Sequence, residues 1–459
     1  MMAHCTHRGL GARRDFLRVG GVTLAAASWE LFNTPPPAFA GTRASRSATA
    51  DSVVFLWLPG GVTHHESFDP KPDAASGIRT EVGLIGTSVP GVQFTEVLPQ
   101  LARHMDKLAL VRSFAAGTED HFLGQALALS GRNALTGGIL SEPNFGSFIW
   151  QQKGATGGLP GYLAVPGTTE PGPPNTNLFT AAWLGQKYAP FATRGEPRSP
   201  DFRVEDLALV EGLTNDRLAR RQTLRQIVEG RLRTAERHKA LDDLQQLYGR
   251  AVGLITSPQV RKAFDVHAEP TTAKEKYGLT KIGQRCLLAR RLLEADARFV
   301  MVDYGYDWGE YNNLWDNHCA PVQNQPVIHK MVKEPYHLPA VDQAFAALID
   351  DLHRSGRLER TLVVYLTEFG RTPKINSNGG RDHWAHAGSI FYVGGGVRGG
   401  QVIGSTDRDG AYCTSRTYSP AEAVATVYRA IGVEPDTLVT NRDGRTAPIQ
   451  PTGEPIPVF

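Results

Sequence analysis

The sequence has no run of about 18 consecutive apolar residues, the length that a membrane-spanning helix needs, so it is not a polytopic membrane protein. The formal net charge is only +3 over 459 residues, and so small an excess gives no electrostatic footprint for binding nucleic acid. Four cysteines are too few for a disulfide scaffold. A hydrophobic fraction of 41% is ordinary for a globular protein and is enough for a large core.

The first forty residues have the features of an export signal. Arg13 and Arg14 precede a short, weakly apolar stretch, and the tripeptide Ala38-Phe39-Ala40 follows it. Such a pattern is typical of a signal peptide, and paired arginines are typical of the Tat pathway; the alternative is a short buried helix. We expect a Tat signal peptide at 1–40, a disordered leader at 41–51, and a mature protein that is periplasmic or extracellular. The mature chain would keep three cysteines, whose pairing stays open: Cys286, Cys319 and Cys413.

Short apolar segments alternate with helical patterns in the mature chain. We expect strands at 52–61, 108–111, 297–304, 361–366 and 389–396, and helices at 97–105, 122–129 and 338–353. A continuous apolar run that ends in Pro-Gly-Gly, as at 52–61, is typical of a strand buried on both faces. The alternation predicts an α/β fold with three layers, in which helices cover a largely parallel central sheet. Residues 204–250, rich in charge with Leu at helical spacing, are expected to be a helical insertion in one domain at 52–459.

Two clusters of polar residues follow the first two predicted strands, where parallel sheets bind ligands. The first contains His64, Glu66 and Asp69, and imidazoles with carboxylates suit zinc, manganese or a similar metal. Its alternative is a polar loop whose histidines hydrogen-bond the backbone. The second contains Thr118 and His121 at the start of a helix, whose free N–H groups attract an anion. Its alternative is that Thr118 is only an N-cap.

Two further clusters follow later strands. One contains Asp316 and His318, two residues apart. The other contains Glu368 at the end of a strand, Arg371 after it, and three further candidates for metal binding: Asp382, His383 and His386. Acids and imidazoles at successive strand ends are what a metal site assembled from separate loops requires. We expect them to converge in one cleft, although a salt bridge from Arg371 or Arg381 to Asp316 is the alternative.

These motifs resemble a known family. The strings RRDFLRVGG, LWLPGGVTHHESFDPKP, WDNH, VVYLTEFGRTPKIN, GRDHWAHAGS and VGGGVRGGQVIGSTD are similar to those of the Tat-exported bacterial family called domain of unknown function 1501. The order of the acids, the histidines and the apolar strand in the late half is similar to that of the alkaline phosphatase and sulfatase superfamily. The resemblance implies an alkaline phosphatase-like fold and a sulfatase-like, metal-binding hydrolase.

The resemblance also implies roles for single residues. Asp316 and His318 are similar to the Asp and His that bind one metal in the superfamily, and Glu368 stands where an Asp binds the other. Asp382, His383 and His386 fall where a later His returns to the first metal. The first cluster stands where the superfamily's first Asp binds, which implies Glu66 or Asp69 as ligand, with His64 as a further candidate.

The chain departs from the sulfatase pattern at three points. The Asp expected after the first strand is displaced into a His-rich turn. Phe369 replaces a His that usually binds metal, and His121 stands where sulfatases have the Cys or Ser that becomes formylglycine. We therefore expect a hydrolase of sulfate or phosphate esters without the formylglycine motif, using divalent metal ions (zinc, manganese or calcium). Two ions would clamp the reacting oxygens. Thr118 or a hydroxide ion would be the nucleophile, His121 a base or ligand, and Arg371 would stabilise the developing charge. The alternative is a non-catalytic exported binding protein that keeps the hydrolase fold.

Overall fold

The computed structural model describes residues 47–132, 142–167, 181–204, 207, 214, 216–218, 220–225, 239–305, 314–440 and 444–459. The predicted signal peptide therefore lies outside the described residues. Residues Ser47–Phe459 form one compact unit. Within the predicted leader, the amides of Thr49 and Ala50 both donate to the carbonyl of Ala430, each at 2.9 Å, so the end of this segment is ordered. Among the described residues, no helix is long and apolar enough to cross a membrane.

The centre of the unit is a sheet of eight strands in the order β12-β4-β11-β8-β1-β7-β5-β6. In that order the strands are β12 (Gln401–Ile403), β4 (Leu108–Phe114), β11 (Gly388–Val393), β8 (Thr361–Leu366), β1 (Ser52–Trp57), β7 (Phe299–Asp303), β5 (Leu163–Val165) and β6 (Phe191–Ala192). Both pairings of β11 are antiparallel, and the other neighbours are parallel. The predicted α/β fold with a largely parallel sheet is confirmed.

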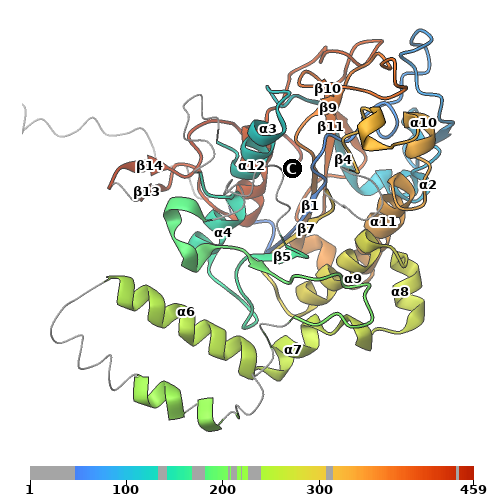
Figure 1. The fold of residues 1–459 in the computed structure, drawn as a ribbon. Coiled ribbons are helices and arrows are strands. Elements are labelled where there is room, and N and C mark those ends of the chain that lie inside the picture. The colour runs from blue at the N-terminus through green and yellow to red at the C-terminus, as the bar shows by residue number, and fades with distance from the viewer. Residues whose placement is uncertain are drawn as a thin grey trace, which may run out of the picture. The chain divides into compact units, whose positions relative to one another are not determined.

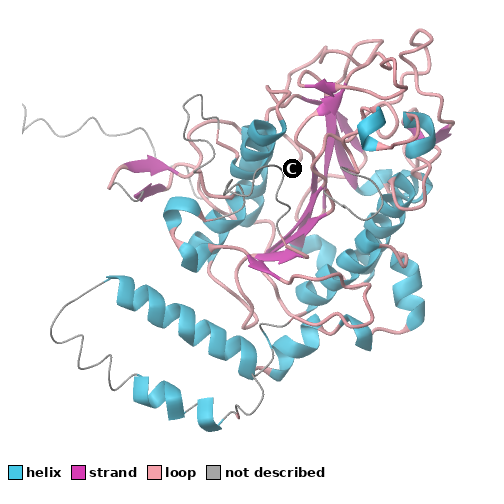
Figure 2. Cartoon of the chain, in the orientation of Figure 1, coloured by secondary structure: helices cyan, strands magenta, loops and turns pink. Residues whose placement is uncertain are grey.

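Helices cover both faces of this sheet (Figures 1 and 2). Val54 and Leu56 of β1 belong to the core on one face, under α2 (Pro99–Arg103), α9 (Lys281–Glu294) and α11 (Leu338–Arg354). Val53 and Phe55 belong to the core on the other, under α3 (His121–Ser130), α4 (Phe145–Lys153) and α12 (Pro420–Ile431). Successive side chains of a strand point to opposite faces, so a strand buried on both sides needs the continuous apolar run that β1 has.

The remaining elements are peripheral. They are the helices α6 (Lys239–Thr256), α7 (Pro258–Phe264), α8 (Thr271–Tyr277) and α10 (Ile328–Met331), and three antiparallel pairs, β2 (Leu84–Gly86) with β3 (Gln93–Thr95), β9 (Gly370–Arg371) with β10 (His383–Trp384), and β13 (Leu438–Thr440) with β14 (Thr446–Pro448). Only part of the predicted insertion at 204–250 is described. Its helix α6 continues to Thr256, six residues past the predicted end.

The topology brings the predicted polar clusters to one edge of the sheet. Strands β4, β8, β1 and β7 run in the same direction, so the loops that leave their carboxyl ends meet there. Strand β11 runs the opposite way, so β10, which precedes it in the chain, lies at that edge as well. The site is built from these loops.

Candidate metal centre

Three imidazoles from three separate segments of the chain converge on one carboxylate oxygen. Oδ1 of Asp316 lies 3.3 Å from Nε2 of His121, 3.0 Å from Nε2 of His318 and 3.0 Å from Nε2 of His383. The Nε2 atoms of His318 and His383 are 2.9 Å apart. His121, Asp316 and His383 each offer one ligand atom within 4.8 Å of the others. The same ring nitrogen of each histidine thus faces a common point.

The other ring nitrogen of each histidine is held by an acceptor. Nδ1 of His121 bonds to Oε1 of Glu368 at 2.7 Å, and Nδ1 of His318 bonds to Oδ1 of Asp382 at 2.7 Å. Nδ1 of His383 bonds to the carbonyl of Glu119 at 2.6 Å. An acceptor at Nδ1 places the proton there and leaves the Nε2 lone pair free, which is the usual arrangement around metal-binding histidines. Glu368 and Asp382 therefore orient ligands in this structure, rather than facing the common point.

Without a cation, the polar atoms at this point are poorly matched. Oδ1 of Asp316 also accepts from Nη2 of Arg371 at 2.8 Å, so four nitrogens face one oxygen, more than its lone pairs can accept. Nε2 of His121 is buried and makes no hydrogen bond within the described residues. The Nε2 atoms of His318 and His383 face each other, although each Nδ1 already holds an acceptor. A cation that accepts several lone pairs at once removes this conflict.

The charges at this point also shift the pKa values of the same groups. Burial lowers the pKa of His121, but the carboxylates of Asp316 and Glu368 outweigh it and raise that pKa to about 9. Burial raises the pKa of Asp316, but Arg371 and the surrounding imidazoles hold it far below its usual range. The hydrogen bond to Asp316 raises the pKa of His318, whereas burial lowers that of His383. Without a cation, Asp316 is thus ionised and His121 protonated at neutral pH.

The donor atoms fit a small divalent cation. Zinc is held by nitrogen and oxygen ligands at about 2.0–2.1 Å, so a tetrahedral site has donor–donor separations of about 3.3–3.4 Å. Oδ1 of Asp316 lies 3.0–3.3 Å from the three Nε2 atoms, close to that separation. His121, Asp316 and His383 form the tightest group of donors, and His318 adds a fourth donor 2.9 Å from His383. A His₃Asp donor set is also the chemistry that a borderline metal prefers. The residues present therefore fit the metal that the resemblance implies.

Local structure explains how these side chains are placed. His121 is the first residue of α3, whose N-cap Asp120 accepts from the amide of Leu123 at 2.8 Å. Oε2 of Glu368 accepts from the amide of Gly60 at 2.7 Å, which joins the turn after β1 to the end of β8. Gly60 has φ +122°, and a Cβ there would lie 2.8 Å from that of Trp315, so only glycine allows this close approach.

Phe369, the departure noted in the sequence, packs beneath the imidazoles. Its ring centroid lies 5.1 Å from that of His121 and 4.7 Å from that of His383. Its side chain is fully buried. An apolar ring therefore packs against two of the imidazoles, and Phe369 itself offers no metal ligand.

The first predicted cluster makes a different structure. Glu66 is fully buried, and its carboxylate accepts hydrogen bonds from Nε and Nη2 of Arg381 at 2.8 and 2.7 Å. Asp69 pairs with Lys71 and Arg112 and accepts from the hydroxyl of Thr406.

Nε2 of His64 bonds to the carbonyl of Gly410 at 2.8 Å. This is the alternative expected from the sequence, in which the histidines bond to the backbone. His64, Glu66 and Asp69 make none of the contacts described above for Asp316.

Three other predicted residues also lie apart from the ligand positions. Arg371 is fully buried, and besides Asp316 it donates to the carbonyls of Gly60, Gly61, Trp315 and Arg381. Its Nε and Nη2 groups are thus committed to the protein and its side chain is fully buried, so it does not face a substrate, and the predicted salt bridge to Asp316 is present. Thr118 is half-buried and accepts from the amide of Asp120 at 3.2 Å, so it is not the N-cap of α3. His386 is exposed and packs against Trp384 and Tyr412.

Two supporting residues were not anticipated. Asn376 donates to Oδ1 of Asp382 at 2.9 Å, and Gln323 donates to Oδ2 of Asp316 at 3.2 Å. Both follow motifs that were identified, but an amide in a loop has no sequence signal that separates it from other loop amides.

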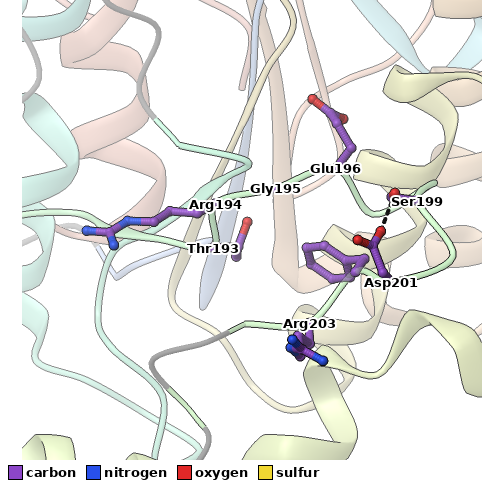
Figure 3. Close-up of a pocket in the computed structure, with 8 residues that line it drawn as sticks. Thr193, Arg194, Gly195, Glu196, Ser199, Asp201 and Arg203 are labelled. Atoms are coloured by element: carbon purple, nitrogen blue, oxygen red, sulfur yellow. Dashed lines mark hydrogen bonds between the residues drawn. The ribbon is translucent and has the colours of Figure 1, made fainter.

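A hollow of about 440 Å³ lies elsewhere, in the loop after β6 (Figure 3). Several of its charged groups are paired: Ser199 donates to Asp201 at 2.6 Å, and Glu196 pairs with Arg285. Its lining, Thr193–Glu196, Ser199 and Asp201–Arg203, contains none of the predicted site residues.

Comparison with known proteins gives a family but no activity. The model of the family described as "Protein of unknown function (DUF1501)" matches residues 50–458. No curated protein matches the chain.

Among solved structures, similarity is found to a phosphonate monoester hydrolase from Silicibacter pomeroyi (11% identity, 88% of this chain and 76% of that one, TM-score 0.41). It is also found to a sulfatase from Pseudoalteromonas sp. (13%, 92% and 72%, TM-score 0.30) and to a protein in the alkaline phosphatase superfamily from Vibrio parahaemolyticus (10%, 85% and 68%, TM-score 0.38).

Proposed function

The chain belongs to the DUF1501 family of proteins of unknown function, and from that premise we propose that it is a divalent-metal-dependent hydrolase of sulfate or phosphate esters. The observation that carries the proposal is the convergence of three Nε2 atoms on Oδ1 of Asp316, while each Nδ1 is held by its own acceptor. Such a set is costly to bury unless a cation compensates it. We therefore assign His121, Asp316, His318 and His383 as the ligands.

The surrounding residues hold this set in place. Arg371 fixes the Asp316 carboxylate and the turn after β1, and Glu368 and Asp382 orient His121 and His318. A divalent cation bound there would supply Lewis acidity toward an ester oxygen. Thr118 lies in the loop that leads to His121, and it is the chain's own candidate nucleophile. Its oxygen accepts from the amide of Asp120, and that bond does not use the hydroxyl proton.

One feature of the site favours the second candidate, a non-catalytic binding protein that holds a metal. The assigned set provides four donors, the number that closes a tetrahedral structural site, whereas catalytic sites usually keep one position open. The two functions differ in turnover and not in metal content.

Turnover with the metal restored tests the hydrolase. We expect hydrolysis of at least one of p-nitrophenyl sulfate, p-nitrophenyl phosphate and bis(p-nitrophenyl) phosphate, abolished by EDTA and by His383→Ala. His353→Ala, an exposed histidine near the end of α11, is the matched control and should keep the activity. Metal-loaded protein that hydrolyses none of them would favour the binding protein.

We also propose export through the Tat pathway, supported by the paired Arg13 and Arg14. Changing both to Lys should leave the precursor in the cytoplasm, as measured by cell fractionation. Mature protein outside the cytoplasm despite this change would contradict the Tat route without affecting the metal centre.

A further inference from the structure

Three aromatic rings form a solvent-facing cluster beside the metal centre. We call Trp384, His386 and Tyr412 the aromatic platform. Their ring centroids are 4.9 Å (Trp384–His386), 5.5 Å (Trp384–Tyr412) and 5.2 Å (His386–Tyr412) apart. Tyr412 is 53% exposed, and His386 is exposed as well. Aromatic rings that remain together at the surface of a protein commonly mark a binding site.

The backbone that presents Tyr412 is held rigidly. The carboxylate of Asp407 accepts from the amides of Ala411 and Tyr412 at 2.7 and 3.2 Å, and the amide of Asp407 donates to the carbonyl of Tyr412 at 2.9 Å. Nε1 of Trp384 donates to the carbonyl of Ala411 at 2.5 Å, which joins the two parts of the platform.

Two buried histidines hydrogen-bond to the turn that precedes Tyr412. Nε2 of His64 bonds to the carbonyl of Gly410, and Nε2 of His65 to that of Asp409, each at 2.8 Å. Burial lowers the pKa of both imidazoles, so both are neutral donors. The first polar cluster thus supports the platform, and a rigid surface loses little entropy when it binds a ligand.

The platform lies next to the metal centre but on the other side of a narrow ribbon. Trp384 follows the ligand His383 in β10, and successive strand residues point to opposite faces. A ligand that touches both the metal centre and the platform must extend from one face of the β9–β10 pair to the other. It must therefore be longer than the group that carries the ester.

The ring geometry indicates the chemistry of that ligand. The three interplanar angles are 75°, 63° and 42°, so no two faces are parallel and there is no slot for a flat aromatic group. A shallow surface of tilted rings suits the C–H face of a saturated ring, whose hydroxyl groups stay in water or bond to nearby polar atoms. A sugar ring has both properties.

We propose that the aromatic platform binds a pyranose ring of an oligosaccharide or polysaccharide. That this carbohydrate carries the ester acted on at the metal centre rests on the proposed function, whereas the binding itself does not. The chain then recognises a sugar polymer at the platform, one ring or more away from the reacting group.

Affinity gel electrophoresis tests the platform without turnover. The full mature chain is run through gels that contain hydroxyethylcellulose, laminarin, dextran sulfate or chondroitin sulfate, with and without EDTA. We expect retardation by at least one of them that persists in EDTA, and roughly three- to tenfold weaker binding for Tyr412→Ala and for His386→Ala, the loss expected for one aromatic contact. Tyr248→Ala, which removes a tyrosine of α6 that is 49% exposed, is the matched control and should bind like the unmodified protein.

Three outcomes contradict the proposal. No retardation in any gel would overturn it, and so would equal retardation of the unmodified protein and Tyr412→Ala. Retardation that disappears in EDTA and is unchanged in Tyr412→Ala would place binding at the metal. Platform binding without hydrolysis of any ester would leave the inference standing and remove only the proposed hydrolase.

Discussion

Replacing Glu368 by Gln should weaken metal binding without changing the ligands. Both oxygens of the fully buried Glu368 are used, Oε1 by Nδ1 of His121 and Oε2 by the amide of Gly60, each at 2.7 Å. Gln has one acceptor oxygen, so its NH₂ group must face one of these two donors. A buried donor that loses its partner costs about 1–3 kcal/mol, and loss of an outer hydrogen bond to a metal-binding His weakens affinity about 10- to 100-fold. We expect the metal dissociation constant of Glu368→Gln to rise by that factor.

Cobalt(II) provides the assay because its absorption spectrum reports its ligands. Titration against a competing chelator gives the dissociation constant, and the spectrum of Glu368→Gln should keep the shape seen for the unmodified protein. Asp382→Asn is the matched comparison and should have a smaller effect, because the Asp382 side chain is 52% exposed and water can replace it. Unchanged affinity in Glu368→Gln would refute the orienting role, and a changed spectrum would show that Glu368 is itself a ligand.

Three further predictions follow from buried charges. Glu66→Gln should lower the free energy of unfolding, measured by denaturant titration, by about 3–5 kcal/mol, because Arg381 stays buried without its charged partner. The metal content should not change. A loss of metal would instead identify Glu66 as a ligand. Burial raises the pKa of Asp342 to about 6, so between about pH 4 and 6 the folded state binds more protons than the unfolded state. The free energy of unfolding should therefore fall as pH rises through this range. Asp342→Asn should remove that slope, and an unchanged slope would contradict the raised pKa of Asp342. His121, with a pKa of about 9, must lose its proton to bind metal, so the metal affinity should rise about tenfold for each unit by which the pH is raised toward 9. Calorimetry in buffers of different ionisation enthalpy should detect the released proton. An affinity that does not depend on pH would contradict this role.

The sheet was predictable because its central strands are buried on both faces. β1 and β8 require unbroken apolar runs, and such runs are visible in a sequence. The outer strands β5, β6 and β12 have only two or three residues. Their pairing depends on the neighbouring strand, and segments this short show no periodicity, so they were not predicted.

The candidate site was predictable as a set of loops but not as a set of roles. Asp382 and His383 are adjacent in the chain, yet Asp382 orients His318 whereas His383 faces Asp316. Spacing along the chain does not separate these roles, because strand geometry and a distant partner decide them. Similarly, Glu66 in its His-rich turn has the composition of a metal loop, but its partner Arg381 lies 315 positions further along the chain.

The metal content of protein purified without chelators tests the central claim most directly. Elemental analysis should find about one divalent ion per chain, the number that one four-donor site holds. His383→Ala and Asp316→Asn should lose this ion, and His386→Ala, which changes the other histidine that the sequence indicated nearby, should retain it. Metal-free protein whose thermal midpoint is unchanged by zinc, manganese or calcium would contradict the metal centre and leave the Arg371–Asp316 salt bridge as its explanation.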